Sequence, residues 1–203
     1  LVPALRAGNP PLSPSRQTFA AARNQGRPAL AIDLTNATVV AALNLSVPER
    51  NAVAMLVEEV EKRTLVTWPV QSVLPASGRP IVVVGTFAQV RPLVGTRAAG
   101  LALDESGIGA EGYQIATRPA GPDGGPLLVV AGRDARGVLF GAGHLLRTLH
   151  LGPARAGLMQ PLEVSSAPRY ALRGHQLGYR PKPNSYSGWD IPQWRQYIRE
   201  LAI

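Results

Sequence analysis

Acidic side chains gather at one point of the sequence where catalysis or metal binding could be expected. Glu58, Glu59 and Glu61 stand almost side by side, followed by Lys62. Neighbouring carboxylates can serve as acid and base or hold a hard metal ion. The apolar residues of the stretch 47–63 recur with helical spacing, and the acids fall on the opposite side. They are therefore interpreted as the solvated face of a helix.

A second pattern with chemical meaning is a G-x-G-x-x-G motif formed by Gly107, Gly109 and Gly112. Such glycines bind a dinucleotide when they follow a strand and open a helix, because the pyrophosphate then meets free backbone N–H groups. Here the motif leads into residues 113–117, which alternate like a strand. The sequence therefore predicts no nucleotide cofactor at these glycines.

Few other groups suited to catalysis occur in the chain. The absence of cysteine excludes disulfides, thiolate metal sites and cysteine nucleophiles. His144 and His150 stand singly, without the H-E-x-x-H spacing of zinc ligands, and no G-x-S-x-G motif is present. We expect no catalytic residue, no metal site and no cofactor within this chain.

The segment after Gly178 is rich in side chains that suit sugar binding. Aromatic rings stack on the apolar faces of sugars, and arginines pair with carboxylates such as that of a uronic acid. The residues concerned are Tyr179, Arg180, Lys182, Asn184, Tyr186 and Trp189. The alternative is an ordinary loop whose aromatic residues pack against protein. Asp190, an expected helix cap, and Glu200, late in that helix, are not suited to catalysis.

Composition describes a globular chain with a marked positive charge. Of its 203 residues, 45% are apolar and 17% are charged, and the net charge is +8. The arginines are scattered singly, and no basic run or RNA-binding aromatic motif occurs, so no nucleic acid is expected as a partner. No apolar run approaches the ~18 residues of a membrane span. The proline-rich residues 1–27 lack the apolar stretch of a signal peptide and are expected to be loosely ordered.

Two helices have clear start signals. Ser46 and Glu49 form an S-x-x-E capping box at the start of a helix over 47–63. Asp134 is the expected N-cap of a second helix over 134–150. Both stretches repeat apolar residues at helical spacing, which predicts one face of each helix packed on a core.

Short β-branched runs around these helices predict strands. The strongest covers residues 80–85, and its unbroken apolar character indicates burial on both faces. Gly137, Gly141 and Gly143 lie inside the second helix, where each costs up to ~1 kcal/mol relative to alanine. They predict close packing of that helix on a sheet. The predicted fold is α/β (α+β), a small sandwich of helices on a mixed β-sheet.

The stretch GYQIATRPAGPDGGPLLVVAGRDARGVLFGAGHLLRTL resembles a known domain. It is similar to the non-catalytic N-terminal domain that precedes the barrel in family 20 β-hexosaminidases and family 67 α-glucuronidases. The matching features are the Glu-Gly-Tyr at 111–113, a second strand, and the glycine-punctuated helix from Asp134 to Leu149. PERNAVAMLVEEVEKRT is similar to the first helix of those domains. The resemblance covers roughly residues 37–150.

The motifs PRY and RG within 168–174 resemble the entry to the first barrel strand of family 20. The resemblance implies that Arg173 is the arginine that contacts the non-reducing sugar and that Arg180 lies near the second basic position. With Tyr179 they form the predicted substrate-binding set. Gly178 stands where the family has an Asp, a departure from the hexosaminidase pattern.

The expected organisation has four parts. They are a lead-in (1–27), an accessory α/β domain (28–160), a linker (161–171) and the truncated start of a (β/α)8 barrel (172–203). The barrel is called truncated because a full barrel needs about 250 residues. By the resemblance, the catalytic acids lie beyond residue 203. The parent is expected to be a secreted or periplasmic glycoside hydrolase that binds carbohydrate through the missing barrel, and the chain alone to be inactive. The alternative is a free-standing basic module that binds acidic glycan or nucleic acid.

Overall fold

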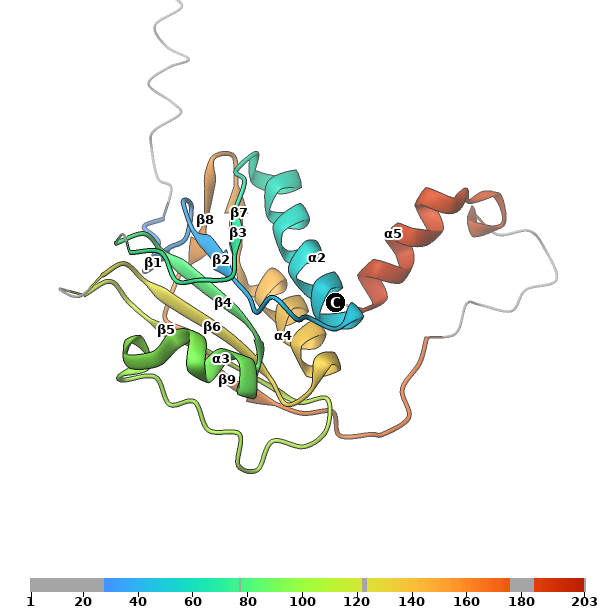
Figure 1. The fold of residues 1–203 in the computed structure, drawn as a ribbon. Helices are drawn as coiled ribbons and strands as arrows, with labels where there is room; N and C mark the ends of the chain where they lie inside the picture. The colour runs from blue at the N-terminus through green and yellow to red at the C-terminus, as the bar shows by residue number, and fades with distance from the viewer. Residues whose placement is uncertain (1–27, 77, 122–123, 176–184, 203) are drawn as a thin grey trace, which may run out of the picture.

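The computed structural model describes residues 28–76, 78–121, 124–175 and 185–202. Within these ranges, strands and helices alternate along the chain and form a mixed α/β fold, as predicted (Figure 1). No helix in the described ranges is long and apolar enough to cross a lipid bilayer.

The larger sheet organises the fold. Its strands in the described residues are β2 (Thr38–Val40), β3 (Val70–Gln71), β4 (Ile81–Thr86), β5 (Tyr113–Arg118), β6 (Leu127–Gly132) and β9 (Glu163–Ser166), in the order β3-β2-β4-β6-β5-β9. β3, β2, β4 and β6 run parallel, whereas β5 is antiparallel to both of its neighbours. The sheet is therefore mixed, and β9 lies at one of its edges.

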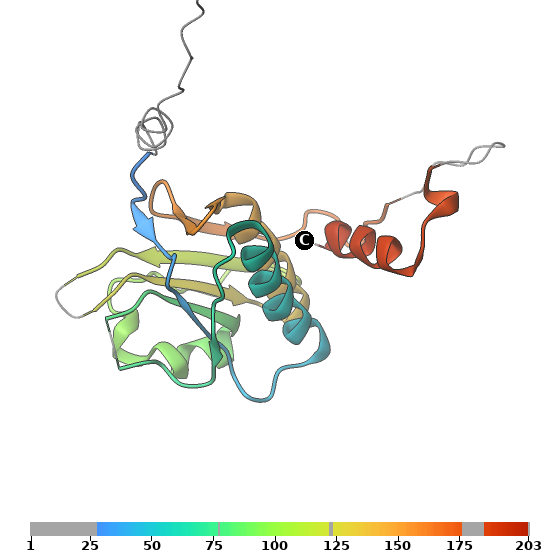
Figure 2. The same cartoon turned by 90° about the horizontal axis from the view of Figure 1, so that it is seen from above.

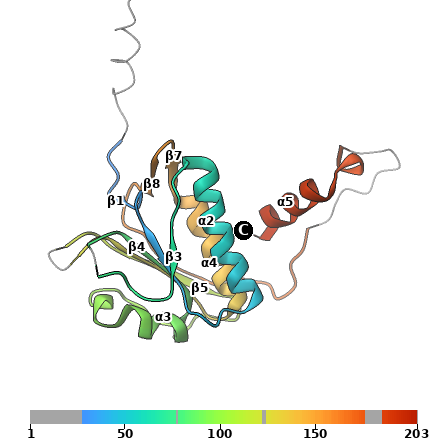
Figure 3. The same ribbon diagram turned by 45° about the horizontal axis from the view of Figure 1, so that its top comes forward.

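Helices cover both faces of this sheet. α2 (Val47–Thr64) and α4 (Ala135–Thr148) lie side by side on one face, and α3 (Phe87–Val94) lies on the other (Figure 3). Val82 and Val84 of β4 join the core under α2 and α4, while Ile81 and Val83 pack with α3. The predicted burial of this strand on both faces is confirmed.

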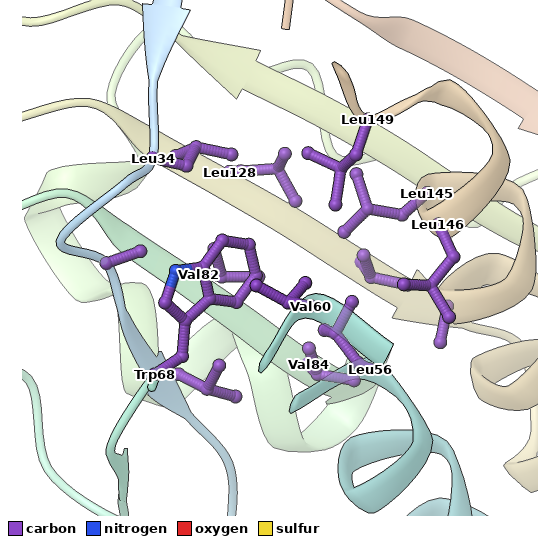
Figure 4. Close-up of a cluster of buried hydrophobic side chains, with 14 of the residues drawn as sticks. Leu34, Leu56, Val60, Trp68, Val82, Val84, Leu128, Leu145, Leu146 and Leu149 are labelled. Carbon is purple, nitrogen blue, oxygen red and sulfur yellow. The ribbon is translucent and has the colours of Figure 1, made fainter. Parts of the chain in front are cut away.

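The core beneath α2 and α4 is the larger of the two. Leu56 and Val60 from α2, and Leu145 from α4, meet the sheet residue Leu128 there (Figure 4). Trp68, which follows α2, is only 1% exposed and completes the cluster. Burial of such large apolar side chains is the main term that stabilises the fold.

The start of α4 is fixed by its cap. The carboxylate of Asp134 accepts hydrogen bonds from the backbone N–H groups of Arg136 at 3.0 Å and Gly137 at 2.9 Å. Along the same helix, a Cβ at Gly137 would meet the backbone of Gly112, and one at Gly141 would meet Val130. At these two positions the predicted close packing of the helix on the sheet is confirmed.

We expect Asp134→Ala to lower the free energy of unfolding by about 1–2 kcal/mol. The loss arises because two N–H groups of the first turn, and that of Glu111 at 2.7 Å, lose their acceptor. Asp134→Asn keeps one side-chain oxygen as an acceptor and should retain part of the stability. Urea unfolding followed by circular dichroism measures both variants; equal losses for Ala and Asn would contradict a capping role.

A smaller sheet was not anticipated. β1 (Ile32–Asp33), β7 (His150–Gly152) and β8 (Arg155–Leu158) form an antiparallel sheet in the order β1-β8-β7. The helix expected to run to residue 150 ends at Thr148, because the chain turns there into the β7–β8 hairpin. β9 likewise forms within the range predicted as a linker, 161–171, and pairs with β5.

The glycine motif is followed by a strand, as predicted. Gly112 leads directly into β5, and its N–H group donates to the carbonyl of Gly109 at 3.1 Å, within a turn. The motif therefore does not open a helix, which is what binding of a pyrophosphate at these glycines would need. α3 and the 3₁₀ turn Gly95–Ala98 account for much of the stretch between β4 and the motif.

The closing part of the chain contains a 3₁₀ turn, Ser185–Gly188, and α5 (Ile191–Ala202). Asp190 and Gln193 form the predicted reciprocal cap: the N–H of Gln193 donates to the Asp190 carboxylate at 2.8 Å, and the N–H of Asp190 to the Gln193 amide oxygen at 2.9 Å. Residues 172–175 form no strand, and 176–184 lie outside the described residues, so the first barrel strand stays a prediction.

α5 stands apart from the two sheets (Figure 2). No residue of this helix is buried, although its apolar positions repeat at helical spacing. The sequence predicts that Ile191, Trp194, Ile198 and Leu201 form the buried apolar stripe of this helix. In the structure Ile191, Ile198 and Leu201 are 68%, 60% and 49% exposed. Arg199 pairs with Glu58 of α2 at 2.6 Å, which ties the helix to the sheet domain by charge.

Candidate functional site: the Arg173 surface

Of the three predicted substrate-binding residues, Arg173 lies within the described part of the chain. Tyr179 and Arg180 fall outside the described residues, so their proximity to Arg173 stays a prediction. Arg173 belongs to the segment 168–175, which leaves β9 and passes over α4. We call this segment the exit segment.

Three contacts hold the Arg173 side chain. Its guanidinium pairs with the carboxylate of Glu111 and donates to the backbone carbonyl of Tyr170 at 2.5 Å. The guanidinium also lies over the ring of Phe140 in α4, 5.5 Å from its centroid. A planar guanidinium suits both a carboxylate and an aromatic face, so the arginine links the exit segment to two elements.

Glu111 is itself fixed in place. Its N–H donates to Asp134 at 2.7 Å, and its carboxylate pairs with Arg136 as well as Arg173. The hydrogen bonds from Arg173, and then from Arg136, lower the pKa of this carboxyl group below its ordinary value. It is therefore ionised at neutral pH and is not suited to act as a general acid there.

A cavity of about 440 Å³ lies beside this surface, between α4, the end of β9 and α5. Tyr113 and Phe140 supply aromatic walls, and Arg147, Arg173 and Glu200 supply charge. The volume falls in the range of small-molecule sites, roughly 300–1,000 Å³. Of the two lining guanidinium groups, that of Arg173 is already paired with Glu111, so a bound carboxylate would be contacted by Arg147 beside the aromatic side chains. Such a lining is suited to binding a sugar or a carboxylate rather than to bond cleavage.

The wall of this cavity contains a tyrosine–histidine pair. The Tyr113 hydroxyl and His144 Nδ1 are 2.8 Å apart, and the rings meet edge to face. Burial, and to a lesser degree the charge of Arg147, lowers the pKa of His144 below its ordinary 6.5. The imidazole is therefore neutral at pH 7, and its Nδ1 can accept the proton of the Tyr113 hydroxyl.

We expect NMR titration to give His144 a pKa below 6.5, and Arg147→Gln to raise it. Because the folded-state pKa is depressed, the unfolded chain binds the proton more readily, and stability falls as pH drops through about 6.5. In the His144→Gln variant, the free energy of unfolding should fall less between pH 7 and pH 5 than it does in the original protein. A His144 pKa at or above 6.5 would contradict the role of burial.

The acidic cluster of α2 was interpreted as a solvated helix face, and Glu58 and Glu61 are exposed as predicted. For Glu59 that prediction is wrong, because this residue is 5% exposed and its side chain is held by ion pairs along the helix. Glu59 pairs with Arg63 at 3.1 Å, Glu61 accepts from the Thr67 hydroxyl at 2.9 Å, and Glu58 pairs with Arg199. In the described residues, no three His, Asp or Glu side chains come together in a way that could hold a metal ion.

The partnership of Glu111 and Arg173 was missed from the sequence. The two residues lie 62 positions apart, and neither belongs to a recognised pairing motif. A weak signal exists, because Glu111 stands in the Glu-Gly-Tyr start of β5, the same motif that carries the resemblance to glycoside hydrolases.

No protein-family model matches the chain, and neither does any curated protein. Solved structures give partial matches. A family GH115 4-O-methyl-α-glucuronidase with specificity for decorated arabinogalactans matches 58% of this chain and 14% of its own, at 20% identity and a TM-score of 0.42. The N-acetyl-β-hexosaminidase of Streptomyces plicatus and the GH20 β-N-acetylhexosaminidase of Streptomyces coelicolor A3(2) each match 71% of this chain and 26% of theirs, at 20% identity, with TM-scores of 0.38 and 0.40.

The similar structures include the β-hexosaminidase class predicted from the sequence, and an α-glucuronidase of family 115 rather than 67. The chain spans 14% to 26% of the length of these three proteins. TM-scores below 0.5 at 20% identity do not establish a shared function, so function has to be argued from the residues of this chain.

Proposed function

We propose that this chain contains the non-catalytic α/β domain of a glycoside hydrolase, β-hexosaminidase-like or α-glucuronidase-like, followed by the first βα unit of its catalytic barrel. The observation that carries the proposal is α5. It is a capped amphipathic helix whose apolar residues Ile191, Ile198 and Leu201 are exposed. A helix of this kind is stable in water when its apolar face packs on another element, as the first helix of a barrel does.

The acids near α5 support an inactive chain. Asp190 is engaged in the helix cap, and Glu200 accepts a hydrogen bond from the Gln196 amide at 2.9 Å. Glycoside hydrolysis generally needs two placed carboxyl groups, or one acid with a substrate group that replaces the nucleophile. In the proposed parent these acids come from later barrel strands, while Arg173, Tyr179 and Arg180 contact the substrate. A parent of this class would act outside the cytoplasm.

A free-standing basic module is less well supported. Arg91 and Arg133 pair with Glu105, at 3.1 and 2.8 Å, and Arg136 and Arg173 pair with Glu111. The two carboxylates offset half of the positive charge of these four arginines and hold their side chains in place, which weakens the attraction of an acidic polymer to this part of the surface.

The test compares this 203-residue chain with the full gene product. We expect the full product to release 4-nitrophenol from 4-nitrophenyl N-acetyl-β-glucosaminide, or 4-O-methylglucuronic acid from a decorated glycan, and the chain alone to release neither. Failure of the full product with both substrates would overturn the proposal. Activity of the chain alone would overturn the claim that it is non-catalytic.

A further inference from the structure

The charged groups of the described chain include two carboxylates that each bind a pair of arginines. Glu105 pairs with Arg91 of α3 and with Arg133, which directly precedes the N-cap of α4. All three residues belong to the sheet domain, so these ion pairs join parts of that domain to one another. Glu111 differs, because one of its two arginines, Arg173, lies beyond the last strand of the sheet. Glu111 therefore joins the domain to the exit segment, as Glu58 joins it further along the chain to Arg199 of α5.

Glu111 is held rigidly enough to act as a fixed acceptor. Its backbone has φ of 59°, a left-handed conformation that residues other than glycine adopt rarely and that persists where neighbours enforce it. The hydrogen bond from its N–H to Asp134, the N-cap of α4, supplies that constraint. The Glu111 carboxylate is therefore fixed next to the N-terminus of α4, where it pairs with Arg173 of the exit segment.

Arg173 is matched to this acceptor on three sides. The carboxylate of Glu111 pairs with one nitrogen, the carbonyl of Tyr170 accepts from another, and the ring of Phe140 lies under the guanidinium plane. By contrast, the side chains of Tyr170 and Leu172 are largely exposed, so apolar burial contributes little to holding this segment. Arg173 is thus its main attachment.

From this arrangement we propose that Glu111 is a positioning residue that docks the exit segment on α4 through Arg173. It thereby fixes the direction in which the chain leaves the α/β domain. The proposal concerns an interaction within this chain and does not depend on the proposed glycosidase function. The proposal gives the glutamate of the Glu-Gly-Tyr motif a role of its own. Glu111 is not needed for strand pairing, because the pairing of β5 begins at Tyr113.

The experiment measures how readily the exit segment detaches. Chymotrypsin binds the residues on both sides of the scissile bond in an extended form, and Arg173, which directly follows Leu172, has to leave Glu111 and Phe140 to adopt it. The rate of cleavage after Tyr170 and Leu172 therefore rises with the detached population. Glu111→Gln keeps the size of the side chain but removes its charge. We expect cleavage at these two sites to become about fivefold faster or more, while the thermal midpoint of the domain changes little. Mass spectrometry identifies the cut sites.

Glu105→Gln is the matched control, because it also removes a carboxylate that binds two arginines but has no contact with the exit segment. It should leave the cleavage rate unchanged. Glu111→Gly provides a second variant that suits the positive φ, in case the glutamine variant folds poorly. Arg173→Gln should also speed cleavage, and adding Glu111→Gln to it should add little, since both changes remove one interaction.

Faster cleavage in the Glu111 and Arg173 variants, together with an unchanged rate in Glu105→Gln, supports the proposal. It is overturned if neither Glu111 variant changes the cleavage rate, if Glu105→Gln speeds cleavage equally, or if the effects of Glu111→Gln and Arg173→Gln simply add. The cleavage assay uses the 203-residue chain and no sugar, so its result does not depend on whether the parent is a glycosidase. Likewise, the glycosidase test does not depend on how the exit segment is docked.

Discussion

Replacing Gly137 with alanine is expected to destabilise the protein by about 3 kcal/mol or more, a loss at the upper end for overpacking. A Cβ at this position would overlap the carbonyl oxygen of Gly112 and lie 3.3 Å from the Cα of Gly132. Both neighbours are backbone, and the Gly112 carbonyl also accepts the N–H of Arg133 at 2.8 Å, so neither can yield cheaply. Helix propensity alone predicts the opposite sign, a gain of up to ~1 kcal/mol for alanine.

Two further glycines serve as controls. A Cβ at Gly141 would meet side chains, with Val130 Cγ1 at 2.7 Å and Tyr113 Cβ at 3.2 Å, which can shift partly, so Gly141→Ala should cost less than Gly137→Ala. At Gly152 nothing lies within 4 Å and the effect should be near zero. Urea unfolding followed by circular dichroism measures all three. A Gly137→Ala variant as stable as the original would show that α4 does not pack on the Gly112 backbone as closely as described.

The helices with strong local start signals could be predicted from the sequence. The capping box at Ser46 is formed as expected, with the N–H of Ser46 donating to the Glu49 carboxylate at 2.6 Å, and Asp134 caps α4. Such signals act within one turn of helix and need no distant partner. α3 has a similar box, with the N–H of Thr86 donating to Gln89 at 2.8 Å, but this helix was not predicted from the sequence.

Of the smaller sheet, β1 falls within the apolar run 29–34, which the sequence predicts as a strand, whereas β7, β8 and the pairing of all three could not be predicted in the same way. β1 and β8 contribute two paired residues each, Ile32 with Leu158 and Asp33 with Gly157. Segments this short have little preference of their own and form because a distant partner supplies the hydrogen bonds. Sequence patterns over a local window do not contain that information, and the same reason applies to β9.

The candidate site was predicted only in part. Arg173 was singled out through the resemblance, and the structure gives it Glu111 and Phe140 as partners, which no local spacing indicates. Contact with sugar by Arg173 stays a prediction, as do the roles of Tyr179 and Arg180. A pair formed by residues 62 positions apart depends on the whole topology of β5, α4 and the exit segment.

The second large effect is expected at Trp68, where replacement by alanine should cost about 3–5 kcal/mol. Trp68 is almost fully buried among α2, β4 and the residues before β2, with Val60 and Val82 beside it (Figure 4). Its indole N–H donates to the carbonyl of Thr35 at 3.3 Å. Since small domains are stable by only about 5–15 kcal/mol, this single change should leave the fold marginal. Urea unfolding measures the loss.

Trp194→Ala is the matched control, since it removes the same side chain from α5. Trp194 is half-buried and packs edge to face with Trp189 and Tyr197, outside the core of the sheet domain. If α5 awaits a partner surface, as the proposed barrel would supply, its loss should change the main unfolding transition by less than about 1 kcal/mol. An effect as large as that of Trp68→Ala would mean that α5 unfolds together with the sheet domain. Its exposed apolar face would then no longer argue for a missing partner.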